Sequence, residues 1–429
     1  MKKYELYKDS GVGWIGEIPS HWSCVKVKHL LRERVDKSED GIGEPLSMSQ
    51  KYGLIPTSQM DVVPNLATSY VGAKRTRQGD MVLNKLKAHL GVFALSAYDG
   101  LVSPDYAVYY GTGRADLEYL EYLFKTPLYV SEFIKKTTGV AIGFNRLYTD
   151  DLFSIPAHYP PMQEQKRIVD YLKDKTLKIE QYVSARERER ELLDSLKQSE
   201  IANVVTKGLN PNVRMKDSGI PWIGMIPEHW EVKRLRHFIK FVSVKGHGEK
   251  PLLSVTREQG VIERNVESKE ENHNFIPDDL SGYKLVRKGQ FVINKMKSWQ
   301  GSYGVSDYEG IVSPAYYVCD LTFPCKKFFS MAIRSKAYIP FFTQYSKGIR
   351  VDQWDLSPIG LKSIPFIVPP IEEQQAIVDY IEAKLSKIDS CMADLQAEID
   401  YLKEFKQRLI SDVVTGQICV AKPQKGEQQ

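Results

Sequence analysis

The sequence predicts an α+β protein in which two α/β globular domains are separated by two long antiparallel helices that form a coiled-coil rod, with pseudo-twofold symmetry from an internal repeat. Two observations predict this class. The phrase "DSGVGWIGEIPSHW" at residues 9–22 returns as "DSGIPWIGMIPEHW" at residues 217–230. In addition, a long proline-free stretch with helical periodicity follows each of two Pro-Pro pairs, at 160–161 and at 369–370.

The repeat extends over almost the whole chain. "GDMVLNKLKAHLG" (79–91) returns as "GQFVINKMKSWQG" (289–301), and "YDGLVSPDYAVY" (98–109) returns as "YEGIVSPAYYVC" (308–319). All these pairs have nearly the same offset, close to half the chain length. One unit is therefore written twice, and its architecture should be found twice in the structure.

Each copy divides into a turn-rich part with short β-type runs and a helical part that begins after the prolines. The tryptophans of the duplicated phrase are expected to pin this arm onto the globular part. We expect five segments, namely a first globular domain at 1–155, a first long helix at 156–210, a second globular domain at 211–364, a second long helix at 365–421 and a polar tail at 422–429.

Apolar residues recur in both helical stretches at spacings of three, four or seven, which indicates an amphipathic helix with a seam. The expected seam residues are Ile168, Leu172, Ile179, Leu193 and Leu196 in the first copy, and Ile377, Ile381, Ile388, Leu395, Leu402, Phe405 and Leu409 in the second.

A helix of about 45 residues is roughly 67 Å long, which exceeds the width of a domain of this size. The seam therefore needs a partner, and the other copy supplies one of equal length. Because the copies are joined head to tail, antiparallel packing with a globular domain at each end is the simplest arrangement. The start of the chain can then meet the end of the second helix.

Composition favours a globular protein without membrane segments. Of the 429 residues, 42% are hydrophobic and 26% charged, and no apolar run is long enough to span a bilayer. Five cysteines without a C-x-x-C spacing argue against a disulfide framework or a zinc knuckle. A cytoplasmic location is expected.

Motifs that indicate catalysis are missing from the sequence or are present in only one copy. "GVGWIG" matches G-x-G-x-x-G, but the second copy has Pro221 in place of Gly13, and proline cannot donate a backbone N–H to a phosphate. The chain contains no Gly-Lys pair, which excludes a P-loop, and no H-E-x-x-H. The acid of "SPDY" (103–106) is Ala315 in the other copy. We expect no catalytic, cofactor or metal site.

Basic residues cluster at matching places of the two globular parts, mixed with Asn, Gln, Trp and Tyr in turn-rich segments. A solvated basic face is the alternative interpretation, but recurrence in both copies favours contacts to nucleic acid. The expected DNA-binding residues are Lys74, Arg75, Arg77, Lys85, Lys87 and His89 in the first domain, and Arg257, Lys284, Arg287, Lys295, Lys297, Trp299 and Arg350 in the second.

Two variable globular halves, each closing on "SIPAHYPPMQEQKRI" or "SIPFIVPPIEEQQAI", together with the duplicated arm, resemble the specificity subunit of type I restriction–modification systems. The resemblance implies that each half is a target-recognition domain for one part of a split, asymmetric double-stranded DNA site. It implies that the helices set the spacing and dock methyltransferase subunits, two in number, and that restriction subunits join them. S-adenosylmethionine, ATP and magnesium would then belong to those partners, and this chain would be non-catalytic.

Two other functions remain open from the sequence. The chain could be a protein–protein tether with a coiled-coil spacer, in which case bulk DNA would not compete with its partners. It could also be a self-sufficient DNA-modifying enzyme, although the missing nucleotide and metal motifs argue against this.

Overall fold

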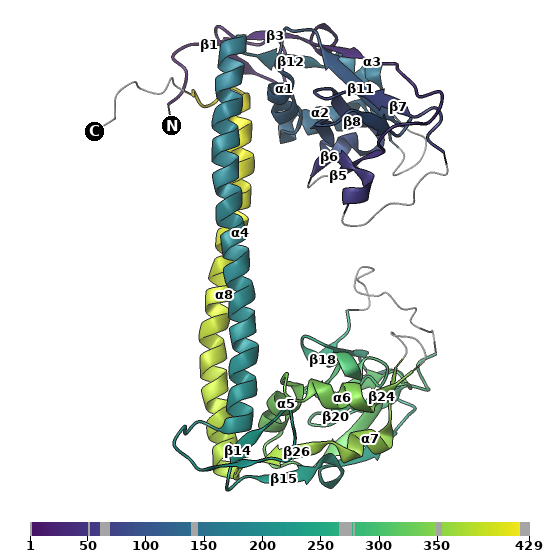
Figure 1. Cartoon of the computed structure of the whole chain (residues 1–429), viewed down its shortest axis with the longest axis vertical. Helices are drawn as coiled ribbons and strands as arrows, with labels where there is room; N and C mark the ends of the chain where they lie inside the picture. Colours follow the sequence, from purple (N-terminus) through teal and green to yellow (C-terminus); the bar gives the residue numbers. More distant parts are fainter. Residues whose placement is uncertain are drawn as a thin grey trace, which may run out of the picture. The chain divides into compact units, whose positions relative to one another are not determined.

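The structure is a computed structural model that describes residues 2–49, 52–60, 69–138, 145–265, 277, 279–348 and 354–420. The chain forms two compact units, one built from Met1–Arg186 with Ala397–Gln429 and the other from Glu187–Gln396. Each unit contains one globular domain and the adjoining part of both long helices (Figure 1). The boundary between units therefore passes through the helices and does not separate helices from domains.

The first unit is built around a four-stranded antiparallel sheet with strand order β4-β11-β8-β9. Its strands are β4 (Leu31–Glu33), β11 (Tyr106–Gly111), β8 (Met81–Asn84) and β9 (Phe93–Leu95). Four two-stranded pairs accompany the sheet, namely β1 (Tyr7–Asp9) with β2 (Glu17–Pro19), β3 (Ser23–Lys26) with β12 (Pro156–Tyr159), β5 (Leu46–Ser49) with β6 (Gly53–Pro56), and β7 (Lys74–Thr76) with β10 (Gly100–Val102). The helices of the domain are α1 (Leu117–Phe124), α2 (Pro127–Lys136), α3 (Thr149–Ser154) and the short 3-10 helices at Val27–His29, Thr57–Gln59 and Lys85–Leu90.

The second unit repeats this topology and, among the described residues, adds one further two-stranded pair, β24 with β25. Its sheet has the order β16-β23-β20-β21, formed by Ile239–Val242, Tyr317–Leu321, Phe291–Ile293 and Tyr303–Val305. The paired strands are β13 (Met215–Asp217) with β14 (Met225–Pro227), β15 (Glu231–Arg234) with β26 (Pro365–Val368), β17 (Leu253–Thr256) with β18 (Gly260–Glu263), β19 (Lys284–Val286) with β22 (Gly310–Val312), and β24 (Ser346–Lys347) with β25 (Asp355–Leu356). Its helices are α5 (Lys326–Arg334), α6 (Ile339–Tyr345), α7 (Pro358–Ser363) and the 3-10 helices at Leu235–His237 and Ser298–Gln300.

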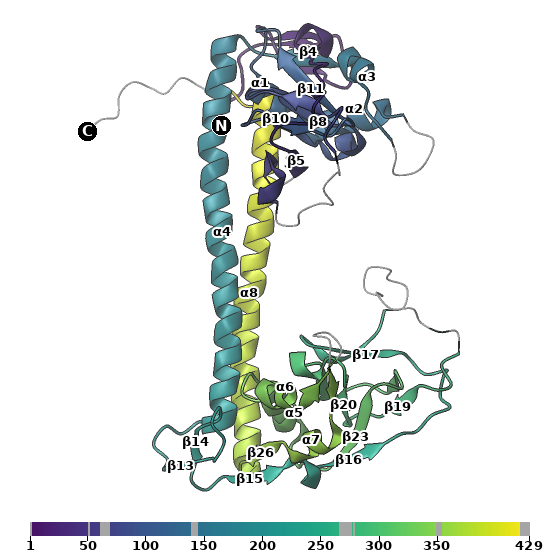
Figure 2. The same cartoon turned by 45° about the vertical axis from the view of Figure 1, so that its right-hand side comes forward.

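The long helices are α4 (Met162–Lys207) and α8 (Ile371–Val414), and each begins directly after its Pro-Pro pair, as predicted. In both units the two helices lie side by side and run antiparallel (Figures 1 and 2). No helix in the described part of the chain is both long and apolar enough to cross a membrane. Two α/β domains with two long packed helices confirm the predicted fold class.

Ion pairs join the helices in each unit. In the first unit Lys406 Nζ lies 2.5 Å from Glu180 Oε1, and Arg186 Nε lies 3.1 Å from Glu398 Oε2. In the second unit Lys197 Nζ lies 2.6 Å from Asp389 Oδ1. Exposed pairs of this kind contribute little each, so the apolar seam supplies most of the stabilisation.

The seam differs in one respect from the predicted pattern. Leu196 is 49% exposed, and Lys197 together with Arg190 and Arg186 occupies the half-buried face of α4. Long basic side chains can cover apolar surface with their methylene stems while the charged ends pair across the seam. The other expected positions divide into buried residues, Ile168, Leu172, Ile179, Ile377, Ile381, Ile388, Leu395 and Leu409, and half-buried residues, Leu193, Leu402 and Phe405.

The first turns of each long helix also belong to the core of the adjoining domain. Ile168 and Leu172 of α4 are fully buried in one cluster with Trp22, Tyr119 and Phe124. The corresponding cluster of the second unit joins α8 to its own domain in the same way. Full burial of such a side chain is worth about 1.5–3 kcal/mol, so each domain is firmly attached to its helix.

The duplicated arm is held by one carboxylate in each unit. Glu164, in the first turn of α4, accepts hydrogen bonds from Trp22 Nε1 at 3.3 Å and from His21 Nε2 at 2.8 Å. Glu373, in the first turn of α8, accepts from Trp230 Nε1 at 3.0 Å in the second unit. The recurring "HW" and "EQ" letters of the two copies are therefore interaction partners.

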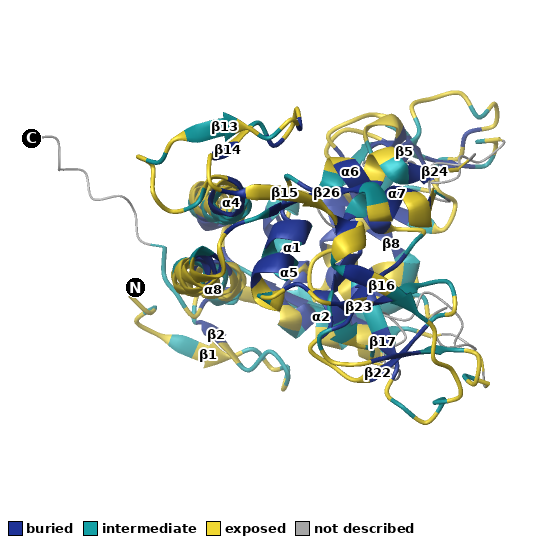
Figure 3. Ribbon diagram, turned by 90° about the horizontal axis from the view of Figure 1, so that it is seen from below, coloured by how far each residue is buried: buried dark blue, intermediate teal, exposed yellow. Residues whose placement is uncertain are grey.

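The same tryptophans contact the end of the other long helix. Gly416 follows α8 with a φ of +77°, and a Cβ there would lie 3.2 Å from the Trp22 ring and 2.6 Å from Pro19. Gly208 follows α4 with a φ of +74°, and a Cβ there would lie 3.2 Å from Trp230. Figure 3 accordingly shows the β1–β2 hairpin beside α8 and the β13–β14 hairpin beside α4. Glycine suits both the left-handed backbone and the close approach.

Residues 2–7 and 414–419 lie together in the first unit, and additional hydrogen bonds hold the end of α8 there. Tyr119 Oη donates to the Val414 carbonyl at 2.8 Å, His158 Nε2 donates to the same carbonyl at 3.3 Å, and Tyr7 Oη donates to the Gly416 carbonyl at 3.0 Å. The second unit, where the chain is continuous, has Met215, Phe328 and Ile367 at the equivalent positions. Those three side chains cannot donate a hydrogen bond.

Replacing Tyr119 by Phe, the residue present in the second copy, should loosen the end of α8. Loss of one buried hydrogen bond costs about 1 kcal/mol, so the amides of the last turn of α8 should exchange with deuterium roughly 5-fold faster. Hydrogen exchange read by mass spectrometry measures this. The last turn of α4 is the internal control, and equal acceleration at both helix ends would contradict a local role for Tyr119.

His158 should make stability pH-dependent. Burial lowers its pKa from 6.5 to about 4, and the hydrogen bond to Val414 offsets this only partly. The neutral form is therefore favoured in the folded chain, and its contribution is complete above pH 6.5 and is lost as the pH falls towards 4.

Between pH 7 and pH 5 the free energy of unfolding should fall by about 2 kcal/mol on account of this residue alone. Urea unfolding at both pH values measures the loss, and His158→Ile, which copies the second unit, should remove that component. An identical pH dependence in the variant would contradict the assignment.

Candidate nucleic-acid interface

In the first domain, basic and polar side chains gather where the central strand β8 ends. Asn84 closes β8 and Lys85 follows it. The backbone N–H of Leu147 donates to the Lys85 carbonyl at 3.2 Å, and Arg146 pairs with Thr138 through two backbone hydrogen bonds. These bonds place Arg146 beside Lys85, and Arg146 Nη2 lies 3.4 Å from Asp105 Oδ1.

The second domain builds the same place from equivalent residues. Asn294 and Lys295 follow β20, and Leu356 N–H donates to the Lys295 carbonyl at 3.0 Å. Asp355 stands where the first domain has Arg146, opposite Lys347 in the β24–β25 pair. Lys295 Nζ contacts Asp355 Oδ2 at 2.8 Å.

Lys74 and Lys85 lie near each other in a partly buried setting. Lys74 is 7% exposed, and its Nζ lies 3.3 Å from Glu33 Oε1, so it is neutralised within the domain. Burial, and secondarily the charge of Lys74, lowers the pKa of Lys85, which also faces Asp105, Glu33 and Arg146. Lys85 is thus a partly desolvated cation, and a phosphate beside it would favour its charged form.

Lys284 is the counterpart of Lys74 but has a different partner. Its Nζ donates to the Tyr316 carbonyl at 2.7 Å, because Phe241 stands where the first domain has Glu33. Burial, followed by the charges of Lys245 and Lys295, lowers its pKa. Lys284 also lines an open pocket of about 330 Å³ with Phe241 and Tyr317.

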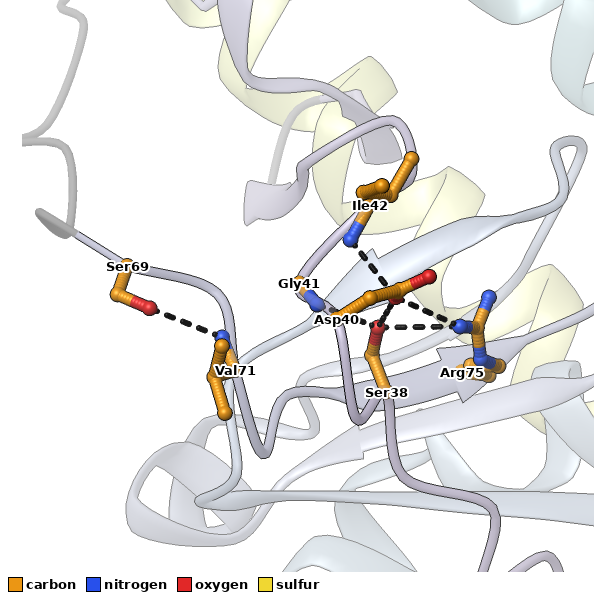
Figure 4. Close-up of polar contacts among 7 residues, drawn as sticks. All are labelled: Ser38, Asp40, Gly41, Ile42, Ser69, Val71 and Arg75. Atoms are coloured by element: carbon orange, nitrogen blue, oxygen red, sulfur yellow. Dashed lines mark hydrogen bonds and ion pairs between the residues drawn. The ribbon is translucent and has the colours of Figure 1, made fainter.

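Arg75 braces a neighbouring loop. Its Nη2 lies 3.1 Å from both Ser38 Oγ and Asp40 Oδ1 (Figure 4). Asp40 Oδ1 also accepts from Ile42 N–H, and this bond contributes most to lowering the pKa of Asp40. Arg75 therefore stabilises a segment in which the two copies differ strongly in sequence.

The remaining expected DNA-binding residues are mostly exposed. Trp299 is half-buried and packs against Trp354, with ring centroids 5.2 Å apart. Arg350 lies outside the described residues. The exposed residues are Arg77, Lys87 and His89 in the first domain and Arg257, Arg287 and Lys297 in the second.

Sequence reasoning missed several residues at this place. Asn84 and Asn294 recur in the motifs "NKLK" and "NKMK", and the Oδ1 of Asn84 is buried without a hydrogen-bond partner among the described residues. The repeat was a usable signal for these amides. No sequence signal marked Asp355, because its pairing with Lys295 is long-range.

The chemistry of the site is that of hydrogen bonding and charge. Among the described residues, no group of three His, Cys, Asp or Glu side chains is placed to hold a metal ion. Lysine, arginine, asparagine and aromatic side chains around a strand end suit contacts to phosphates and base edges.

Comparison with known proteins gives one relative that matches over nearly the whole chain and another that matches over about two thirds of it. No family model matches the chain. The chain is 22% identical over 95% of its length, and 96% of the relative's, to a protein of Methanocaldococcus jannaschii that is named provisionally as the type I restriction enzyme MjaX specificity subunit. It is 24% identical to the MjaVIII specificity subunit of the same organism over 70% of each chain.

A solved structure on complex assembly and conformational transition of the type I R-M system contains a chain of similar fold. The match has a TM-score of 0.66 at 14% identity and covers 94% of this chain and 99% of the other. The repeat, the fold and these relatives agree. Over nearly its whole length the chain is therefore similar to specificity subunits of type I restriction–modification systems, and it shares its fold with a chain from such a system.

Proposed function

We propose that this chain recognises a split, asymmetric site on double-stranded DNA, with one half-site read by each globular domain. The observation that carries the proposal is the pair of domains with the same strand order but different exposed side chains. Equal scaffolds should approach DNA in the same way, while unequal side chains should select different bases. The copies differ most at 41–78 against 246–288.

The long helices suit the role of spacer and docking surface. Each runs along the sequence from one unit into the other, so both domains are attached to both helices. Much of the helix surface that faces away from the globular domains is exposed (Figure 3). We propose that methyltransferase subunits dock there, one per repeat, and that restriction subunits join the complex, as the system of the structurally similar chain suggests.

Footprinting of the chain with its methyltransferase partners tests the split site. Two protected patches separated by accessible base pairs are expected, because two domains contact DNA at two places. A single continuous patch would contradict the proposal.

A protein–protein tether is the competing function. Excess non-specific DNA should compete with the target if the domains bind DNA, and it should leave a tether unaffected. Competition measured on the same complex separates the two functions.

Exposed lysines at equivalent places should contact phosphates. Replacing Lys87 and Lys297 by alanine should weaken binding to all sequences and reduce the slope of log K against log salt by about two, because each neutralised phosphate contributes close to one. Binding measured between low and high salt checks this.

Lys178→Ala on α4 is the matched control, since it removes a charge outside both domains. An unchanged salt slope in the double variant would remove Lys87 and Lys297 from the interface.

A further inference from the structure

One position of the interface has the same scaffold in both domains but opposite charge. Arg146 in the first domain and Asp355 in the second each lie in an antiparallel bridge, to Thr138 and to Lys347 respectively. The residue after each donates its backbone N–H to the carbonyl of the lysine that follows the central strand, at 3.2 Å and at 3.0 Å. The backbone of this position is therefore held alike in the two domains.

The surroundings of the position are adjusted to each charge. Arg146 has an acid next to it, Asp105, whose equivalent in the second domain is Ala315. Asp355 has a base next to it, Lys295, and the hydrogen bond between them is the main cause of the raised pKa of that lysine. In both domains a neighbour of opposite charge reduces the free-energy penalty of partly removing the charged side chain from water.

Both side chains remain available to a ligand. The side chain of Arg146 is 32% exposed and that of Asp355 is 54% exposed. A guanidinium has five N–H donors, and among the described residues the contact to Asp105 occupies one nitrogen. A carboxylate has about four acceptor directions, and Lys295 contacts Asp355 through one oxygen.

Opposite charge means opposite hydrogen-bonding chemistry towards a base pair. Arginine pairs with the O6 and N7 acceptors of guanine, whereas aspartate accepts from the N4 amino group of cytosine. A carboxylate close to DNA is repelled by phosphates unless a cation accompanies it, and Lys295 is such a cation.

We propose that Arg146 and Asp355 are the equivalent base-reading residues of the two domains, with Arg146 reading a guanine of the first half-site and Asp355 a cytosine of the second. This inference rests on the proposed function. Exposed lysines common to both domains, such as Lys87 and Lys297, then position the duplex, and this single position contributes to the difference between half-sites.

The test is selection of bound sequences from randomised DNA by the complex of the full chain with its modification subunits. Arg146→Gln should change the preferred base at one position of the first half-site from guanine to adenine, because glutamine pairs with the N6 and N7 edge of adenine. The second half-site should stay unchanged. Arg114→Gln, an equally conservative change at an exposed arginine of the same domain, should leave the whole motif unchanged.

Asp355→Asn is the reciprocal variant and should alter one position of the second half-site only. Thermal melting of each variant shows whether it is folded. A changed or lost motif in a folded variant can then be assigned to the substituted side chain. An unchanged motif in both folded variants, with normal selection by the wild type, would overturn this inference alone. If the wild type selects no sequence, the proposed function fails, and this inference with it.

Discussion

One buried tryptophan in each unit, placed between the start of one long helix and the end of the other, is the constraint on which the rest of the structure depends. Trp22 donates to Glu164 at the start of α4 and packs against Gly416 just after α8, and Trp230 does the same with Glu373 and Gly208. An indole held in this way allows only antiparallel pairing of the helices. It also attaches each arm to both helices, so a change here would disturb domain and seam together.

The two copies differ in sequence where residues 2–7 meet residues 414–419 in the first unit. Where the second unit has a continuous chain, the first has contact between residues 2–7 and 414–419, and Tyr7, Tyr119 and His158 donate hydrogen bonds to the carbonyls of Val414 and Gly416. A helix end leaves unpaired carbonyls, and side-chain donors can satisfy them. The copies thus differ at this junction for a physical reason, whereas the contacts of each tryptophan with the start of one long helix and the end of the other are the same.

At the candidate interface the backbone is alike in the two copies and the side chains differ. Backbone hydrogen bonds after β8 and β20 are the same in both domains, while the side chains that they present differ, as at Arg146 and Asp355. Such a division suits a protein that must place two domains on DNA in one manner and yet select different bases, because positioning and selection use different atoms. Some cations of the interface, Lys74 among them, are paired inside the domain, so their charge chiefly stabilises the fold.

The sequence by itself determined the duplication, the fold class and the start of both long helices, because a repeat, a Pro-Pro pair and helical periodicity are local signals. It also placed most of the seam, since Ile168, Ile377 and Leu409 follow that periodicity into buried positions. Only the tertiary structure decided that Lys197 lies on the seam face of α4 while Leu196 is exposed. A long basic side chain can lie in a half-buried seam only when an acidic partner, here Asp389, forms an ion pair with it. The tertiary structure likewise decided which lysines are neutralised, since Glu33 and Asp355 reach Lys74 and Lys295 across the fold, and no local pattern encodes such long-range pairing.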